Sequence, residues 1–228
     1  MSRDRSIAKQ VLNALRRSNM TAIGVVLAVM VGIASMASPY FLDEYNLKAL
    51  IRDLAFIGMI GIGQALLLLI GELDLSVGKI ASLCGVVAGM LMVTAGLNPY
   101  LSLVAGLTLG VCLGVLNGLI ITKLRLNSMV VTIGMTGVYG GVTLVLTKGK
   151  AVTNIPEVIH FLGKGAVWQI PVPFVFTLGV LVAVMILVKK TKTGRHVYAI
   201  GNSREAARIL GIKVDRIRIL NYAIMGFI

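Results

Sequence analysis

The sequence has few charged, aromatic, histidine and cysteine residues. Charged residues occupy 14% of its 228 positions and aromatic residues 6%, and there are only two histidines and two cysteines. Soluble domains carry about 25% charged residues, so this composition argues against a water-soluble enzyme. Cys84 and Cys112 both lie inside apolar runs without a second Cys or a His nearby. Neither a disulfide framework nor a metal site is therefore predicted.

Acidic residues are particularly scarce, with 9 Asp and Glu against 22 Lys and Arg, a net charge of +13. Nucleic-acid binding would require these basic residues on a water-facing surface, interleaved with aromatic or polar residues. They cluster instead between apolar runs, so no nucleic-acid partner is predicted. The sequence also lacks the phosphate-binding pattern G-x-x-x-x-G-K-[ST]. No catalytic residue is predicted, and ATP hydrolysis by this chain is not expected.

Apolar residues are abundant, at 57% of the sequence, and the mean hydropathy is +0.92. A bilayer core about 30 Å thick takes about 20 apolar residues per helix. The sequence therefore predicts an all-α, polytopic transmembrane bundle with six complete spans. These spans cover residues 20–38, 54–71, 75–96, 100–122, 128–147 and 171–188. A seventh span begins at 219–228 and is too short to cross, so the chain is expected to be truncated at its C-terminus.

The distribution of Lys and Arg predicts the orientation of the bundle, because cytoplasmic loops carry the excess of these residues. With the N-terminus in the cytoplasm, most basic residues fall inside. This orientation divides the chain into a basic cytoplasmic N-terminus (1–19), a bundle (20–188) with one sizeable outer loop (148–170), a cytoplasmic loop (189–218) and the start of a truncated span (219–228).

Small and polar residues within the spans indicate close helix packing. Four glycines recur every fourth residue in the fourth span, so they share one helix face and allow a neighbouring helix to approach: Gly106, Gly110, Gly114 and Gly118. Asn117 and Thr132 are polar groups that avoid lipid. They either form hydrogen bonds between helices or line a water-filled path.

A short polar break, residues 71–76, separates the second and third spans. Asp74 or Ser76 could cap the third span by accepting from its free backbone N–H groups. Alternatively, Glu72 and Asp74 form a proton or cation site. Glu72 has no obvious cation near it in the sequence except Lys79. The alternative function is therefore a proton-coupled secondary transporter that uses Glu72 and Asp74.

The cytoplasmic loop is predicted to contain a short helix over 203–210. Asn202 and Glu205 have the spacing of a capping box, and Gly211 is placed to end the helix. Ala206, Ile209 and Leu210 form an apolar strip.

Arg204 and Arg208 of this helix are like charges four residues apart, which costs an isolated helix roughly 0.2–0.5 kcal/mol. This cost indicates an external acidic partner, either anionic lipid or a cytoplasmic protein. A membrane scaffold that recruits a protein through this loop is a third, non-transport hypothesis.

Three segments together resemble a known family. They are Gly71–Gly78 (GELDLSVG), residues 117–134, and residues 193–212, which begin TGRHVYAIG and include EAAR and GI. The sequence resembles the permease subunits of ribose-type sugar importers of the ATP-binding-cassette class. The sequence differs from that family's pattern in two places: Glu72 replaces a usual glycine, and Asn127-Ser128 stands where prolines are common.

The resemblance implies that two permease copies form a path for a monosaccharide or a related small polyol in a bacterial inner membrane. A periplasmic binding protein would deliver the sugar, and separate ATPase subunits would hold ATP and Mg, with no cofactor on this chain. The residues expected to couple to the ATPase are Arg204, Glu205, Ala206, Ala207, Arg208 and Gly211. The candidates for the path are Glu72, Asp74, Ser76, Asn117 and Thr132.

Overall fold

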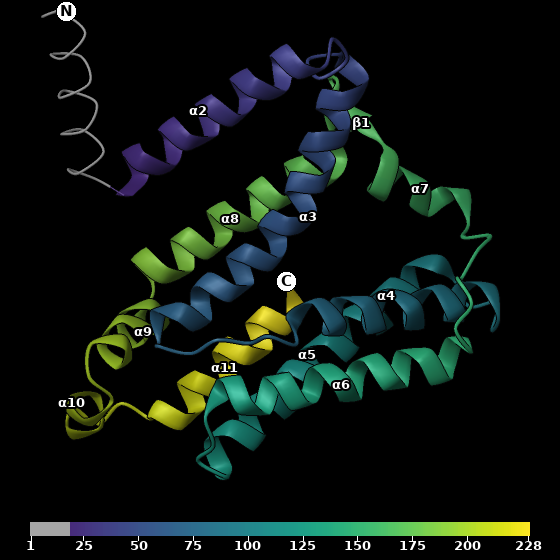
Figure 1. The fold of residues 1–228 in the computed structure, drawn as a ribbon. Coiled ribbons are helices and arrows are strands. Elements are labelled where there is room, and N and C mark those ends of the chain that lie inside the picture. The colour runs from purple at the N-terminus through teal and green to yellow at the C-terminus, as the bar shows by residue number, and fades with distance from the viewer. Residues whose placement is uncertain (1–18) are drawn as a thin grey trace, which may run out of the picture. The chain divides into compact units, whose positions relative to one another are not determined.

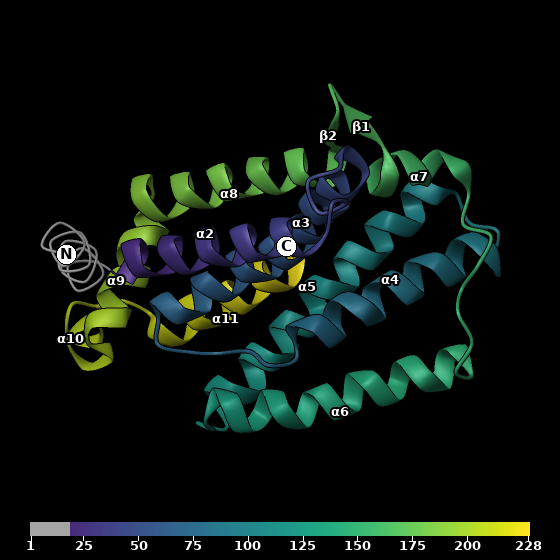
Figure 2. The same ribbon diagram turned by 45° about the horizontal axis from the view of Figure 1, so that its top comes forward.

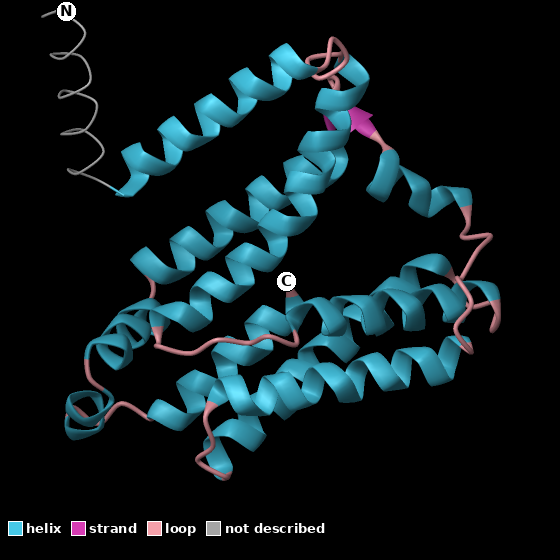
Figure 3. Ribbon diagram, viewed as in Figure 1, coloured by secondary structure: helices cyan, strands magenta, loops and turns pink. Residues whose placement is uncertain are grey.

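The computed structural model describes residues 19–228, which are almost entirely helical (Figures 1 and 3). The all-α fold class is thereby confirmed, whereas nearly all of the predicted basic segment 1–19 lies outside the described residues. The long helices are α2 (Asn19–Ala37), α3 (Glu44–Leu69), α4 (Val77–Val93), α5 (Pro99–Lys123), α6 (Ser128–Thr147) and α8 (Val172–Lys190). The shorter elements are α7 (Glu157–Lys164), β1 (Ala166–Val167), β2 (Ile170–Pro171), α9 (Lys192–Asn202), α10 (Arg204–Ile209) and α11 (Val214–Phe227).

Five of the described helices are long and apolar enough to cross a membrane: α2, α3, α5, α6 and α8. Helix α4 is apolar but has only 17 residues. Each of the six predicted spans coincides with one of these six helices, and α6 has the predicted ends. Helix α3 begins at Glu44, well before the predicted start at residue 54. Residues 44–53 are helical, but they include several charged side chains and therefore do not belong to the apolar run from which the span was predicted.

The chain divides into two compact units, Met1–Leu50 and Ile51–Ile228. In the first unit, α2 is apolar around its whole circumference, with a mean hydropathy of 2.2 over Met20–Ala37. A helix of this kind and length is typical of a single membrane crossing.

Helices α4, α5, α6 and α11 pack together in the second unit (Figure 2). The glycine face of α5 makes the closest approach. A Cβ atom on Gly110 would overlap the carbonyl oxygen of Gly226, and one on Gly114 would overlap that of Tyr222. The other two glycines of this face also pack closely: Gly106 lies against α4, and Gly118 lies against α11. The backbones of α5 and α11 are therefore in direct contact, which larger side chains would prevent.

Helix α8 lies alongside the part of α3 that belongs to the second unit (Figures 1 and 2). The Thr177 hydroxyl donates to the carbonyl oxygen of Ala55 at 3.1 Å. Beyond α8, Thr191 caps α9 by accepting from the Gly194 N–H at 3.1 Å. The chain turns so tightly here that a Cβ atom on Gly194 would overlap the carbonyl oxygen of Val188.

The predicted outer loop, 148–170, contains helix α7 and most of a small hairpin formed by β1 and β2. Trp168 and Gln169 form the tip of the hairpin with φ angles of 51° and 70°. Two consecutive residues with positive φ are typical of a type I′ turn. This turn leaves the Trp168 side chain 94% exposed.

Candidate functional site

Helix α3 ends in a glycine-capped turn, and the polar break follows it. Gly71 adopts a left-handed conformation with φ of 73°, and the Glu72 N–H donates to the Leu67 carbonyl oxygen at 2.9 Å. This is the bonding pattern of a Schellman cap. The residues that follow, 72–74, are neither helix nor strand, and Figure 3 shows them as part of a stretched loop before α4.

Asp74 is the centre of a buried hydrogen-bond network. Its Oδ1 accepts from the backbone N–H of Ser76 at 2.7 Å and from the Ser76 hydroxyl at 2.6 Å. Its Oδ2 accepts from Nδ2 of Asn117 on α5 at 2.9 Å. The hydroxyl of Tyr139 on α6 donates to Oδ1 of Asn117 at 2.7 Å. The break is thereby tied to two of the long helices.

Helix α6 also supplies partners for the backbone of the break. Thr132 Oγ1 accepts from the Leu75 N–H at 3.1 Å, and the Thr136 hydroxyl donates to the Leu75 carbonyl oxygen at 3.2 Å. Ser128 Oγ accepts from the Leu73 N–H at 3.4 Å. Non-helical backbone at membrane depth is tolerated only where such partners exist. Thr132 is one of the predicted path residues, whereas Ser128 is one of the two residues that stand where the family commonly has prolines.

Four of the five predicted path residues lie together in this network: Asp74, Ser76, Asn117 and Thr132. Ser76 is the N-cap residue of α4 by position, but its side chain makes no capping bond to that helix. Its hydroxyl donates to Asp74 instead. The two residues therefore close the break onto α5, rather than capping the free N–H groups of α4.

Glu72, the fifth path candidate, forms a separate buried ion-pair cluster. Its Oε1 accepts from Arg204 Nη2 of α10 at 3.0 Å and from Arg218 Nε of α11 at 2.5 Å. These arginines are the cations that sequence analysis missed, because they lie 132 and 146 residues away. Lys79, the cation expected from the sequence, extends instead toward Gly140 of α6. The position of Glu72 inside the bundle was itself a signal, since a buried carboxylate requires a cationic partner.

The short helix of the 189–218 loop is α10, and its N-cap is Ser203 rather than the predicted Asn202. Ser203 Oγ accepts from the Ala206 N–H at 3.2 Å, whereas Asn202 is the last residue of α9. Gly211 ends the helix as predicted, with φ of 78°. Ala207 is buried, whereas Ile209 and Leu210 are 87% and 75% exposed.

The two arginines of α10 have acidic partners within the chain. Arg204 pairs with Glu72, and Arg208 Nη2 lies 3.8 Å from Asp215 Oδ1 of α11. Asp215 is also 3.9 Å from Arg218 Nη1. The repulsion between the arginines is therefore offset internally and does not by itself require an external acidic partner. Glu205 and Ala206 are exposed.

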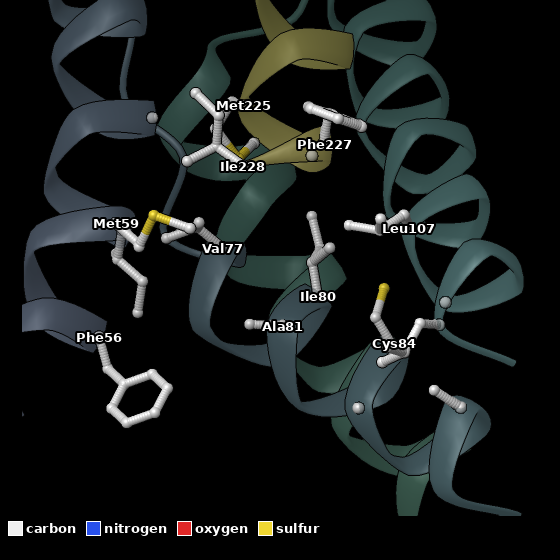
Figure 4. Close-up of a pocket in the computed structure, with 17 residues that line it drawn as sticks. Phe56, Met59, Val77, Ile80, Ala81, Cys84, Leu107, Met225, Phe227 and Ile228 are labelled. Carbon is white, nitrogen blue, oxygen red and sulfur yellow. The ribbon is translucent and has the colours of Figure 1, made fainter. Parts of the chain in front are cut away.

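An apolar cavity of about 400 Å³ lies between α3, α4, α5 and α11 (Figure 4). Its walls include Phe56, Met59, Ile80, Leu107 and Phe227. None of the five path candidates lines it. The cavity therefore lacks the hydrogen-bonding groups that a hydroxyl-rich solute requires. Within residues 19–228, no three His, Cys, Asp or Glu side chains gather as a metal site.

The described residues form an all-α membrane protein with several helices long and apolar enough to cross a bilayer and a buried polar break between α3 and α4. Residues 46–228 match the family model described as "Branched-chain amino acid transport system / permease component", and the chain belongs to this family. The predicted resemblance to sugar-importer permeases is confirmed by curated relatives. No solved structure matches the chain significantly.

Three of these relatives illustrate the similarity. The ribose import permease protein RbsC of Bacillus subtilis is 37% identical over 89% of this chain and 63% of its own length. The L-arabinose ABC transporter permease protein AraH of Azospirillum brasilense is 33% identical over 92% of this chain and 62% of its own length. The xylose/arabinose import permease protein XylH of Sulfolobus acidocaldarius is 33% identical over 95% and 61%. The chain thus spans less than two thirds of the length of these relatives.

Proposed function

We propose that this chain is a permease subunit of an ATP-binding-cassette importer for a monosaccharide or a related small polyol. The observation that carries the proposal is the similarity to permeases named for ribose, arabinose and xylose, which extends over about nine tenths of the chain. The family description names branched-chain amino acids instead. The sugar assignment therefore rests on the individual relatives.

The proposed orientation puts the N-terminus, α9 and α10 in the cytoplasm and α7 with the hairpin outside, in a bacterial inner membrane. The excess of Lys and Arg near α9 and α10 supports this orientation. The exposed Trp168 on the hairpin is suited to the opposite membrane interface.

The partners of the permease follow from the proposed function. A cytoplasmic ATPase subunit, which carries ATP and Mg, docks on α10, and a periplasmic binding protein delivers the sugar. A second permease copy completes the path. The exposed Ile209 and Leu210 next to the exposed Glu205 give α10 the mixed apolar and charged surface that a protein groove recognises.

The network around Asp74 is proposed to shape the path. Asp74, Ser76, Asn117 and Thr132 fix the break to α5 and α6 by hydrogen bonds, and this holds the surrounding helices in position. The proton-coupled alternative has less support. Glu72 is already paired with two arginines, and Asp74 already accepts three hydrogen bonds.

Reconstitution tests the proposal. The natural full-length chain is co-expressed with candidate ATPase subunits, purified in detergent and placed in vesicles with a binding protein. Uptake of labelled ribose, arabinose and xylose is then measured with and without ATP. We expect ATP-dependent uptake of at least one sugar. Uptake that needs no ATPase and collapses with an uncoupler would contradict the proposal and favour the proton-coupled carrier.

Glu205→Lys tests the role of α10 in the same preparation. We expect the variant to insert normally but to lose ATPase attachment and uptake, because the charge at the docking surface is reversed. Glu157→Lys on α7 is the matched control and should retain ATPase attachment. Normal uptake by the Glu205→Lys variant would exclude α10 as the coupling element.

A further inference from the structure

The ion pair between Glu72 and Arg204 connects the loop helix α10 to the polar break that contains Asp74, and the pair between Glu72 and Arg218 connects α11 to it. We propose that Glu72 is a positioning residue that makes α10 and the break move together during transport. The inference rests on the proposed function, in which α10 receives the movement of an ATPase. It assigns to Glu72 a part in transmitting that movement rather than in contacting the sugar.

Three contacts fix α10 and the end of α9 to the end of α3 and the residues that follow it. Arg204 Nη2 donates both to Glu72 Oε1 at 3.0 Å and to the carbonyl oxygen of Ile70 at 3.1 Å. At Gly201, the backbone of α9 approaches so closely that a Cβ atom would overlap the carbonyl oxygen of Leu69. The loop thus contacts the last residue of α3 through direct backbone packing and the break beyond it through an ion pair.

Burial gives the Glu72 contact its strength. The Glu72 side chain is 2% exposed and that of Arg218 is 9% exposed, whereas Arg204 is 40% exposed. Separating a buried carboxylate from its cations leaves an uncompensated charge in a low-dielectric region, which is strongly unfavourable. A displacement of α10 and α11 therefore pulls on Glu72 instead of simply breaking the contact.

Glu72 can pass this displacement on because it is two residues from Asp74. The intervening Leu73 and the following Leu75 are bonded to α6 through Ser128, Thr132 and Thr136. Asp74 itself is bonded to Asn117 of α5. The ion pair between Arg204 and Glu72 at one end of the break is therefore connected, through this hydrogen-bonded segment, to the proposed path residues at the other end.

A double-mutant cycle in the reconstituted full-length complex tests this inference. The variants are Glu72→Gln, Arg204→Gln and the double variant, and the quantity measured is sugar taken up per ATP hydrolysed. We expect each single variant to keep ATP hydrolysis but to lower this ratio roughly tenfold, the range of typical coupling between sites. The double variant should be no worse than Glu72→Gln alone, since Glu72→Gln already removes the contact that Arg204 makes.

Arg204→Gln keeps the test valid if Glu72→Gln impairs folding. Arg204 is partly exposed, and Glu72 retains Arg218 when Arg204 is replaced, so no buried charge is left unpaired. Arg195→Gln on α9 is the matched arginine control. Arg195 is exposed, and its effect should add to that of Glu72→Gln instead of being masked by it.

The possible results separate the two proposals. An unchanged ratio in Glu72→Gln or Arg204→Gln, or additive effects in their double variant, would overturn the role of Glu72 alone. Absence of ATP-dependent uptake by the wild-type complex would overturn the proposed function, and this inference with it.

Discussion

The two carboxylates of the break lie two residues apart in different surroundings. The buried side-chain polar atoms of the Asp74 network all have partners: Asp74 accepts from Ser76 and Asn117, and Asn117 accepts from Tyr139. The Glu72 side consists of Glu72 together with α11, which supplies its partner Arg218. Several buried polar atoms on this side have no hydrogen-bond partner among the described residues, namely Glu72 Oε2, the Tyr222 hydroxyl and both amide atoms of Asn221.

The difference indicates which side of the break has a single stable arrangement of hydrogen bonds. A fully satisfied buried network is rigid, because any change breaks several hydrogen bonds at once. A side with unused donors and acceptors can form new bonds after a displacement. The Asp74 side is therefore suited to hold a shape, and the Glu72 side, toward α10 and α11, is suited to change one.

Removing Asp74 should have the largest effect on stability. Asp74→Ala leaves the buried donors of Ser76 and Asn117 without their acceptor. Each such group costs about 1–3 kcal/mol, so we expect a loss of at least about 3 kcal/mol in the free energy of unfolding. SDS titration in mixed micelles measures it, with exposed Asp53→Ala as the control. Equal effects of the two variants would contradict the central position of Asp74.

The two buried asparagines provide a direct test of the comparison. Asn117→Leu should lower the free energy of unfolding by about 2–3 kcal/mol, because Asp74 and Tyr139 lose a partner. Asn221→Leu should change it by less than about 1 kcal/mol, since no hydrogen bond among the described residues is lost and an unpaired buried amide is removed. A larger loss of unfolding free energy for Asn221→Leu than for Asn117→Leu would contradict the conclusion that the Asp74 network is the more completely hydrogen-bonded of the two.

Displacing α11 should disturb the Glu72 side selectively. Gly114→Ala places a methyl group against the Tyr222 carbonyl oxygen, and such overpacking costs about 2 kcal/mol. Gly134→Ala is the matched control, because a Cβ atom there meets nothing within 4 Å. Thermal unfolding followed by circular dichroism compares the two. A similar midpoint for both variants would argue against backbone contact between α5 and α11.

The smallest effect is expected from the two buried tyrosines. Tyr139→Phe removes the donor to Asn117 and should cost about 1 kcal/mol. Tyr222→Phe removes a hydroxyl that lies near Glu72 and Ser128 but forms no hydrogen bond of normal geometry among the described residues, so the loss in free energy of unfolding should be smaller than for Tyr139→Phe. The same SDS titration measures the free energy of unfolding of both variants. Equal values would contradict the proposed difference between the two sides of the break.

The local features of the fold could be predicted from the sequence. Helix α6 has the predicted ends because its apolar run is bounded by polar residues, and the regular glycines of α5 indicated a close helix contact. Gly211 marked the end of α10 because a left-handed residue is needed there. The N-cap of that helix was wrong by one residue, since Asn202 and Ser203 are both good capping residues and tertiary packing decides between them.

The candidate site was predictable only in part. The polar residues in the spans were visible, and the structure brings Asp74, Ser76, Asn117 and Thr132 together. The partners of Glu72 were not, because Arg204 and Arg218 belong to segments far along the chain. Local periodicity carries no information about such pairing.

The shortness of α4 has a mechanical consequence. Its 17 residues extend only about 26 Å at 1.5 Å per residue, which is less than the thickness of a bilayer core of about 30 Å. The backbone that precedes α4 is held by side chains of α6, through Ser128, Thr132 and Thr136. The depth of α4 therefore depends on another helix as well as on its own length.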